Sequence, residues 1–251
     1  MAFSAWESFL EKHIEGFFNK KFSSSLEPAE LRRKLLKEAV RQKREEDGKI
    51  YVPNSFWLGM QEEDYHRLKS SRVIKDLEIL LMKQVILEDA FMRGELQINF
   101  VKEPEATEGM LLLDVAFAEP PEEADGRAAR DDGAHTIVLK RPAFDVPLNL
   151  PEDVPLAALT VIEGTDLDAC FTLGEKKMFI GRREQSDFIL TDPNTSRLHA
   201  SISYQEHRHI LCDEASTNGL FVHGNRIRQA TLSHGDEIQL GATVLLYEVI
   251  Q

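Results

Sequence analysis

Three short polar segments in the C-terminal part of the sequence hold side chains that suit the binding of a phosphate group. They are Gly181-Arg182-Arg183, Asn194 to His199, and Ser216-Thr217-Asn218-Gly219. An arginine guanidinium binds phosphate through two parallel hydrogen bonds, a serine hydroxyl adds a donor, and an asparagine amide both donates and accepts. If the segments converge, arginine and serine would bind the dianion and asparagine would bind the backbone of the peptide that carries it.

Each segment also has an ordinary structural explanation when it is taken alone. Arg182 could be a solvated loop residue, Ser196 a turn residue, and Thr217-Asn218-Gly219 a simple turn. A histidine on a strand, such as His199, is commonly a hydrogen-bonded core residue. The interpretation therefore depends on all three segments occurring in order between strands of one fold.

The elements that must position these segments are short β-strands. From about residue 157 to residue 251, short runs of alternating apolar and polar residues are separated by polar, glycine-containing turns. Many short strands at close spacing predict an all-β sandwich. The first segment follows the expected strand Met178–Ile180 directly, and the third lies between expected strands that end at Cys212 and begin at Leu220.

The order of these motifs resembles the forkhead-associated (FHA) domain. The resemblance covers roughly residues 157 to 251 and includes Gly181-Arg182, Ser196-Arg197-Leu198-His199 and Thr217-Asn218-Gly219. It implies a sandwich whose loops at one end bind phosphothreonine peptides.

The resemblance also implies a role for each matching residue. Arg182 and Ser196 would contact the phosphate, Asn218 would hold the peptide backbone, and Thr217 and Arg197 would support the site. Three further residues would support the site structurally: Gly181, His199 and Gly219. It implies no catalytic residue, cofactor or metal.

The first 118 residues predict a separate α+β unit. We expect an amphipathic opening helix with the aromatic stripe of residues 3–18, and a second helix from Pro28 to the Asp47-Gly48 pair. An extended segment, residues 49–58, is interrupted by Pro53 and is therefore expected at a sheet edge. A long helix over residues 64–87 and two paired strands, residues 96–101 and 110–117, complete the unit.

This unit resembles the N-terminal domain of bacterial FhaA-like proteins. The residues that carry the resemblance are the opening helix with Phe17-Phe18 and Phe22, the helix from Pro28, and Val52-Pro53-Asn54 with Phe56. The family joins such a domain to an FHA domain through a flexible linker. The resemblance implies an adaptor or scaffold in Ser/Thr kinase signalling, linked to cell-wall synthesis and division.

Residues 119–156 are expected to form that linker. Residues 119–133 include six acidic side chains and no large apolar one, so they cannot bury enough surface to offset the entropy of ordering. Thr136 is a candidate phosphorylation site within it, because small bacterial FHA regulators bind their own phosphorylated N-terminal threonine. The alternative is that the apolar residues beyond Thr136 pack against a domain.

The net charge argues against a general polyanion binder. The chain of 251 residues carries 43 acidic and 30 basic side chains, a formal charge of -13, which would repel nucleic acid and anionic membranes overall. The alternative function is nucleic-acid binding through a basic stretch on the second helix, since small α+β units can resemble KH domains. No Gly-x-x-Gly loop of the KH type occurs. The stretch comprises Arg32, Arg33, Lys34, Lys37, Arg41, Lys43 and Arg44.

Other function classes lack their sequence signals. There is no P-loop, no Gly-x-Ser-x-Gly elbow and no His-Glu-x-x-His pair, so we expect no enzymatic activity. Cys170 and Cys212 have no metal-ligand companions nearby and are expected to be buried in a reducing compartment. No apolar run has the length of a membrane span. We therefore expect a cytoplasmic protein that reaches membranes only through its partners.

Overall fold

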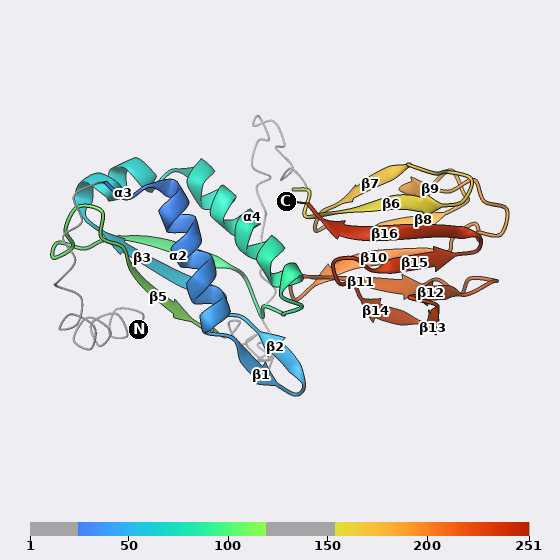
Figure 1. Cartoon of the computed structure of the whole chain (residues 1–251), viewed down its shortest axis with the longest axis horizontal. Coiled ribbons are helices and arrows are strands. Elements are labelled where there is room, and N and C mark those ends of the chain that lie inside the picture. Colours follow the sequence, from blue (N-terminus) through green and yellow to red (C-terminus); the bar gives the residue numbers. More distant parts are fainter. Residues whose placement is uncertain (1–24, 119–153, 251) are drawn as a thin grey trace, which may run out of the picture.

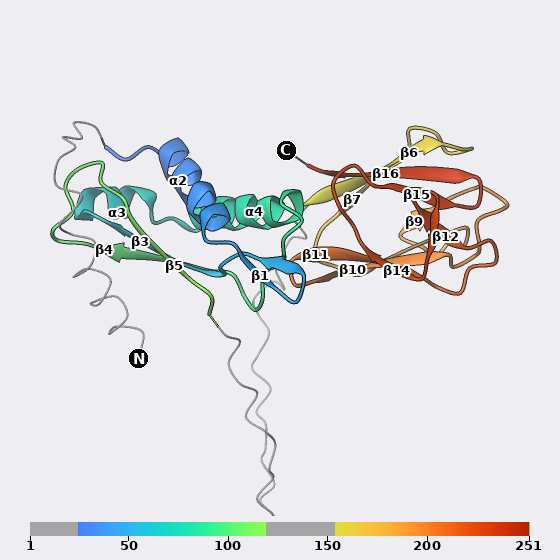
Figure 2. The same ribbon diagram turned by 60° about the horizontal axis from the view of Figure 1, so that its bottom comes forward.

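The computed structural model describes residues 25–118 and 154–250, and Figure 1 shows them as two units side by side. The N-terminal unit has helices on one face of a small sheet, and the C-terminal unit consists of strands alone (Figures 1 and 2). The predicted fold classes, an α+β unit followed by an all-β sandwich, are confirmed. The expected opening helix, most of the predicted linker and Thr136 lie outside the described residues.

The N-terminal unit is built around the central strand β3. Strand β4 pairs with β3 in parallel and β5 pairs with it antiparallel, giving the sheet order β4-β3-β5. The helices cover one face of this sheet (Figure 2). The elements are α2 (Pro28–Arg41), β1 (Arg44–Glu46), β2 (Lys49–Tyr51), β3 (Ser55–Met60), α3 (Glu62–Leu68), α4 (Ser71–Leu87), β4 (Gln97–Lys102) and β5 (Leu112–Ala116).

Two predictions about this sheet were wrong. The segment with Pro53 was expected at a sheet edge, but β3 is the central strand. This is possible because β3 begins at Ser55, after the proline, so Pro53 removes no hydrogen bond from its ladder. The last two strands were expected to pair with each other, but each pairs with β3. The helical connection through α3 and α4 returns the chain parallel to β3, and this places β4 and β5 on opposite sides of it.

Two predicted helix boundaries were also wrong. The second helix ends at Arg41, and Asp47-Gly48 instead forms the turn of the hairpin β1–β2, with φ of 52° and 74°. Such a turn requires positive φ, which aspartate and glycine tolerate. The predicted long helix is divided into α3 and α4 at Ser70, whose side chain caps α4 by accepting the N–H of Val73.

The core of the N-terminal unit lies between the helices and the sheet. It is closed to water, since the inner faces of α2, β3 and α4 contribute side chains that are almost fully buried. Its central members are Leu31, Leu35, Phe56, Leu58, Met60, Leu77 and Leu81.

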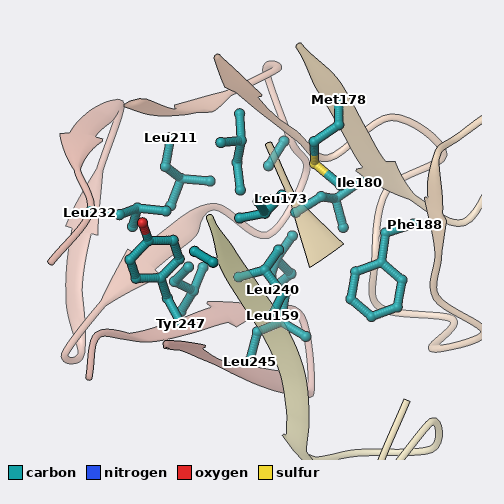
Figure 3. Close-up of a cluster of buried hydrophobic side chains, with 14 of the residues drawn as sticks. Leu159, Leu173, Met178, Ile180, Phe188, Leu211, Leu232, Leu240, Leu245 and Tyr247 are labelled. Carbon is teal, nitrogen blue, oxygen red and sulfur yellow. The ribbon is translucent and has the colours of Figure 1, made fainter. Parts of the chain in front are cut away.

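The C-terminal unit is a sandwich of two sheets, with strand orders β14-β11-β10-β8-β9 and β13-β12-β15-β16-β6-β7. Leu159, Ile180, Leu211, Leu240 and Tyr247 pack between the sheets (Figure 3). The strands are β6 (Ala157–Glu163), β7 (Cys170–Leu173), β8 (Met178–Gly181), β9 (Phe188–Ile189), β10 (Ala200–Gln205), β11 (Arg208–Asp213), β12 (Leu220–Val222), β13 (Asn225–Ile227), β14 (Gln229–Thr231), β15 (Glu237–Leu240) and β16 (Thr243–Val249).

The strand order brings the three polar segments to one end of the sandwich. Strand β10 lies between β8 and β11 and is antiparallel to both, with Ala200 opposite Ile180 on one side and opposite Asp213 on the other. The end of β8, the start of β10 and the end of β11 therefore meet at the same end of this sheet. All three polar segments lie in loops at that end.

The two units share an interface at the opposite end of the same strands. Met82 and Ile86 of α4 belong to the same buried cluster as the sandwich core. The Met92 N–H donates to the carbonyl of Glu206 in the β10–β11 turn at 3.1 Å. Independent units on a flexible linker were expected, and the sequence reasoning missed this contact.

Arg208 is the main polar residue of the interface. Its side chain is only 2% exposed and donates to the carbonyls of Ala90 at 3.2 Å and Leu232 at 2.8 Å. It also pairs with Asp89 at 3.1 Å. Since a buried guanidinium is costly without partners, these bonds tie residues 89–90 firmly to the sandwich.

Candidate functional site

The first loop presents Arg182 immediately after β8. The Arg182 N–H donates to the carbonyl of Ser196 at 3.0 Å, and the Arg183 N–H donates to the carbonyl of Arg197 at 3.0 Å, so the loop runs along its neighbour. The exposed side chain of Arg182 is steadied by a 3.4 Å bond from Nε to the carbonyl of Thr195. Only glycine fits at position 181, because a Cβ there would lie 2.5 Å from the carbonyl oxygen of Arg197.

The second loop is held in shape by Asp192. This buried carboxylate accepts hydrogen bonds from the N–H of Asn194 at 2.9 Å and the N–H of Ala242 at 2.7 Å. The hydroxyl of Thr195 lies 3.2 Å from the carboxylate and 3.0 Å from the carbonyl of Leu240. Burial alone would raise the pKa of Asp192, but these donors favour the ionised form and hold the pKa below its usual value.

His199 links the second loop to the third. Its Nδ1 accepts the Ser196 N–H at 3.1 Å, so the ring proton must lie on Nε2, which donates to the carbonyl of Gly219 at 3.1 Å. Burial lowers the pKa of His199, and the Gly219 carbonyl opposes that shift only in part. The neutral ring of His199 therefore holds the second and third loops together.

The third loop completes the site. The Thr217 N–H donates to Oγ of Ser196 at 3.0 Å, and Nδ2 of Asn218 donates to the carbonyl of Asn194 at 2.7 Å. Gly219 has φ of +88°, a conformation that favours glycine. Thr217 and Asn218 are both exposed, so their free polar atoms remain available to a ligand.

The structure brings all five predicted ligand-binding residues around one open depression of about 420 Å³. In the described part of the chain, neither Arg182 nor Arg197 forms an ion pair, so their charges are not neutralised by a carboxylate. The depression thus combines two guanidinium groups without a carboxylate partner, hydroxyls and an amide, a set suited to an anion on a peptide. The five residues are Arg182, Ser196, Arg197, Thr217 and Asn218.

Sequence reasoning missed Asp192 and Gly241, and it assigned no role to Asn194 and Thr195 of the second segment. Asn194 and Thr195 line the depression, and Asp192 fixes both. Gly241 lies against this loop, since a Cβ there would come 2.7 Å from Asp192 Oδ2. The Asp-Pro-Asn-Thr segment is a turn signal that could have indicated an aspartate bonded to the following backbone.

Four of the seven residues in the basic stretch of the N-terminal unit pair with carboxylates. Arg32 pairs with Asp76, Lys34 with Glu30, Arg41 with Glu38 and Lys43 with Glu88. The guanidinium of Arg44, which lies beyond the helix in β1, stacks over Phe117 at 4.2 Å. Paired charges of this kind give little local field for a nucleic-acid backbone.

Other expectations have simple outcomes. Cys212 is partly buried, but Cys170 is exposed at the start of β7, so the prediction that both are buried was wrong. Among residues 25–118 and 154–250, no cluster of three histidine, cysteine or acidic side chains is placed to hold a metal ion. Within the same ranges, no helix has the length and apolar character needed to cross a membrane.

Comparisons with known proteins agree with both parts of the chain. Residues 3–113 match the family described as the FhaA N-terminal domain, and residues 178–241 match the FHA domain. The oxoglutarate dehydrogenase inhibitor of Corynebacterium glutamicum is 33% identical over 106 residues, covering 42% of this chain and 73% of that protein. The glycogen accumulation regulator GarA of Mycobacterium tuberculosis is 32% identical over 91 residues, covering 36% of this chain and 56% of that protein.

Solved FHA domains are similar to part of this chain. The FHA domain of CT664 from Chlamydia trachomatis is 31% identical, with a TM-score of 0.37, and covers 38% of this chain and 99% of that one. The FhaA FHA domain, solved with the intracellular domain of Rv3910, is 29% identical, with a TM-score of 0.34. The match covers 37% of this chain and 99% of that one. The match spans little more than half the length of the GarA relatives. This chain belongs to the FHA-domain family and joins an N-terminal domain of the FhaA type to a C-terminal FHA domain.

Proposed function

We propose that this chain is a non-catalytic adaptor whose FHA domain binds phosphothreonine peptides. The observation that carries the proposal is the single depression shared by Arg182, Ser196 and Asn218, which come from three separate loops. FHA domains are among the modules that read phosphorylated motifs with arginine side chains. The two curated relatives are named as a regulator and an inhibitor, which agrees with action through binding.

The proposed roles follow from the geometry of each side chain. Arg182 and the hydroxyl of Ser196 bind the phosphate, and the exposed Arg197 adds positive charge at the rim. Thr217 orients Ser196 through its backbone N–H, and the amide oxygen of Asn218 accepts from the peptide backbone. The amide oxygen is left for that role because Nδ2 of Asn218 already donates to the carbonyl of Asn194.

Phosphorylation would act as a switch for this site. Phosphothreonine carries a charge of about -1.5 to -2 at pH 7, whereas threonine carries none. A hydrogen bond to a charged group contributes about 1.5–3 kcal/mol, so two or three such bonds to phosphate change affinity by orders of magnitude. Only the phosphorylated partner would then be bound at cellular concentrations.

The wider role follows from the joined domains. We propose boundaries at residues 1–118 for the FhaA-type domain, 119–156 for the linker and 157–251 for the FHA domain. The adaptor would serve Ser/Thr kinase signalling, including control of cell-wall synthesis or division, and phosphorylated kinases or envelope proteins would recruit it to the membrane. The net charge of -13 supports protein partners rather than nucleic acid.

The test compares one peptide in four forms. Calorimetry with the whole chain would measure binding of a peptide with phosphothreonine, threonine, phosphoserine or glutamate at the same position. We expect measurable affinity for the phosphothreonine form alone, or for it far above the rest. Equal affinity for the threonine and phosphothreonine forms would refute the proposal.

A further inference from the structure

Arg226 lies over the loop that follows the proposed peptide-binding asparagine. Strand β13 pairs with β12, and Arg226 stands opposite Phe221, two residues after Gly219. Its Nε lies 2.7 Å from the point where a Cβ on Gly219 would stand, so the side chain covers that glycine directly. The Arg226 guanidinium therefore lies beside the third loop, next to the residue that follows Asn218.

Arg226 carries an unneutralised charge at this place. It is exposed, and it forms no ion pair with any residue in the described ranges. Three arginines of the N-terminal unit differ from it, because Arg41, Arg67 and Arg93 each pair with a carboxylate at 2.6 Å. Asp213, at the base of the third loop, is already bound to the N–H of Ser216.

The order of residues along the third loop gives Arg226 a place beside a bound peptide. Ser196 and Thr217 come first, the bonded pair Asn194 and Asn218 second, and Gly219 with Arg226 third. A peptide with its phosphate at the first place and its backbone at the second would pass the third with a neighbouring side chain. A carboxylate there would meet the guanidinium.

We propose that Arg226 is a specificity-determining residue that selects phosphothreonine peptides with an acidic side chain near the phosphothreonine. An extended chain covers about 10 Å in three residues, so the acidic residue lies within about three positions. This inference rests on the proposed function, since it concerns the same site. It adds to that function a preference for acidic residues in the peptide sequence around the phosphothreonine.

The test uses phosphothreonine peptides that differ only by glutamate or glutamine at one position, scanned over three positions on each side. The variants are Arg226→Ala and, as a matched control, Arg228→Ala, which removes another exposed arginine two residues along. At one position, we expect the wild type to prefer glutamate about three- to fivefold, as a favourable exposed ion pair would give. Arg226→Ala should lose that preference and bind the glutamine peptide as wild type does, whereas Arg228→Ala should keep it.

Three results would overturn the inference while leaving phosphothreonine binding intact. The first is a wild type without any preference for glutamate, and the second is an Arg226→Ala variant that keeps the preference. The third is an Arg228→Ala variant that loses the preference equally, which would show that the preference depends only on the net charge of the domain. Failure of the wild type to bind any phosphothreonine peptide would instead refute the proposed function. Thermal unfolding of each variant would verify the fold.

Discussion

The backbone N–H of Thr217 donates to Oγ of Ser196 at 3.0 Å and joins two loops that are more than twenty residues apart in sequence. Because the Ser196 oxygen is occupied as an acceptor, its own proton is left to donate. That proton faces the Thr217 hydroxyl at 3.4 Å, a long contact that a phosphate oxygen would replace. Ser196 is thereby prepared as a phosphate donor before any ligand arrives.

Ser196→Ala should weaken phosphothreonine binding by about ten- to a hundredfold, the value of one hydrogen bond to a charged group. Ser203→Ala, further along the same loop–strand segment, is the matched control and should bind as wild type does. Calorimetry with one phosphothreonine peptide would measure both. Equal affinity of Ser196→Ala and wild type would exclude Ser196 from the site.

The neutral state of His199 gives stability a defined pH dependence. Its pKa in the folded chain is lowered by burial, so the unfolded chain takes up the proton first as the pH falls. The free energy of unfolding should be unaffected well above pH 7 and should fall as the pH drops below about 6.5. His207, whose pKa is also lowered by burial, contributes with the same sign.

The variant His199→Asn separates the contribution of His199 to the pH dependence from that of His207. Asparagine can still accept the Ser196 N–H but cannot titrate, so the variant should be less stable than wild type at pH 7.5. It should also lose less stability between pH 7.5 and pH 5.5, as measured by urea unfolding. An unchanged pH slope would show that His199 does not contribute.

Gly181→Ala tests the close approach of the first two loops. The added methyl group would lie 2.5 Å from the carbonyl oxygen of Arg197, so the loops must separate. We expect a loss of about 1–3 kcal/mol in the free energy of unfolding, together with weaker peptide binding. Gly224→Ala is a control for glycine content, since nothing lies within 4 Å of its Cβ position, although its φ of +76° adds some strain. Unchanged binding by Gly181→Ala would show that the spacing of these loops is unimportant.

The sequence indicated which polar residues come together, but not the contacts that hold them there. The convergence of these residues could be expected because motif order and alternating strands both indicate one end of a sandwich. The local bonds of Asp192 to Asn194 and Thr195 could have been inferred from its turn signal, but its bond from the N–H of Ala242, fifty residues away, could not. The interface was missed because Met82 and Ile86 look like ordinary core residues of a helix. Long-range contacts of this kind leave no local pattern.

Arg208→Ala should loosen the contact between the two units. Removing the guanidinium leaves the carbonyls of Ala90 and Leu232 without a donor, at about 1–3 kcal/mol for each buried unsatisfied group. We expect wild type to unfold in one thermal transition and the variant to show two. Arg228→Ala, an exposed arginine on the same unit, should behave as wild type. A variant with a single transition at the wild-type temperature would contradict a stabilising interface.

The central claim is that Arg182 binds the phosphate of a phosphothreonine peptide. The most direct measurement is calorimetry of one such peptide with wild type, Arg182→Ala and the control Arg228→Ala, after circular dichroism has verified that all three are folded. The account predicts that Arg182→Ala loses roughly a hundredfold or more in affinity, since charged hydrogen bonds to phosphate are removed, and that Arg228→Ala does not. Binding by Arg182→Ala as tight as that of wild type would contradict it.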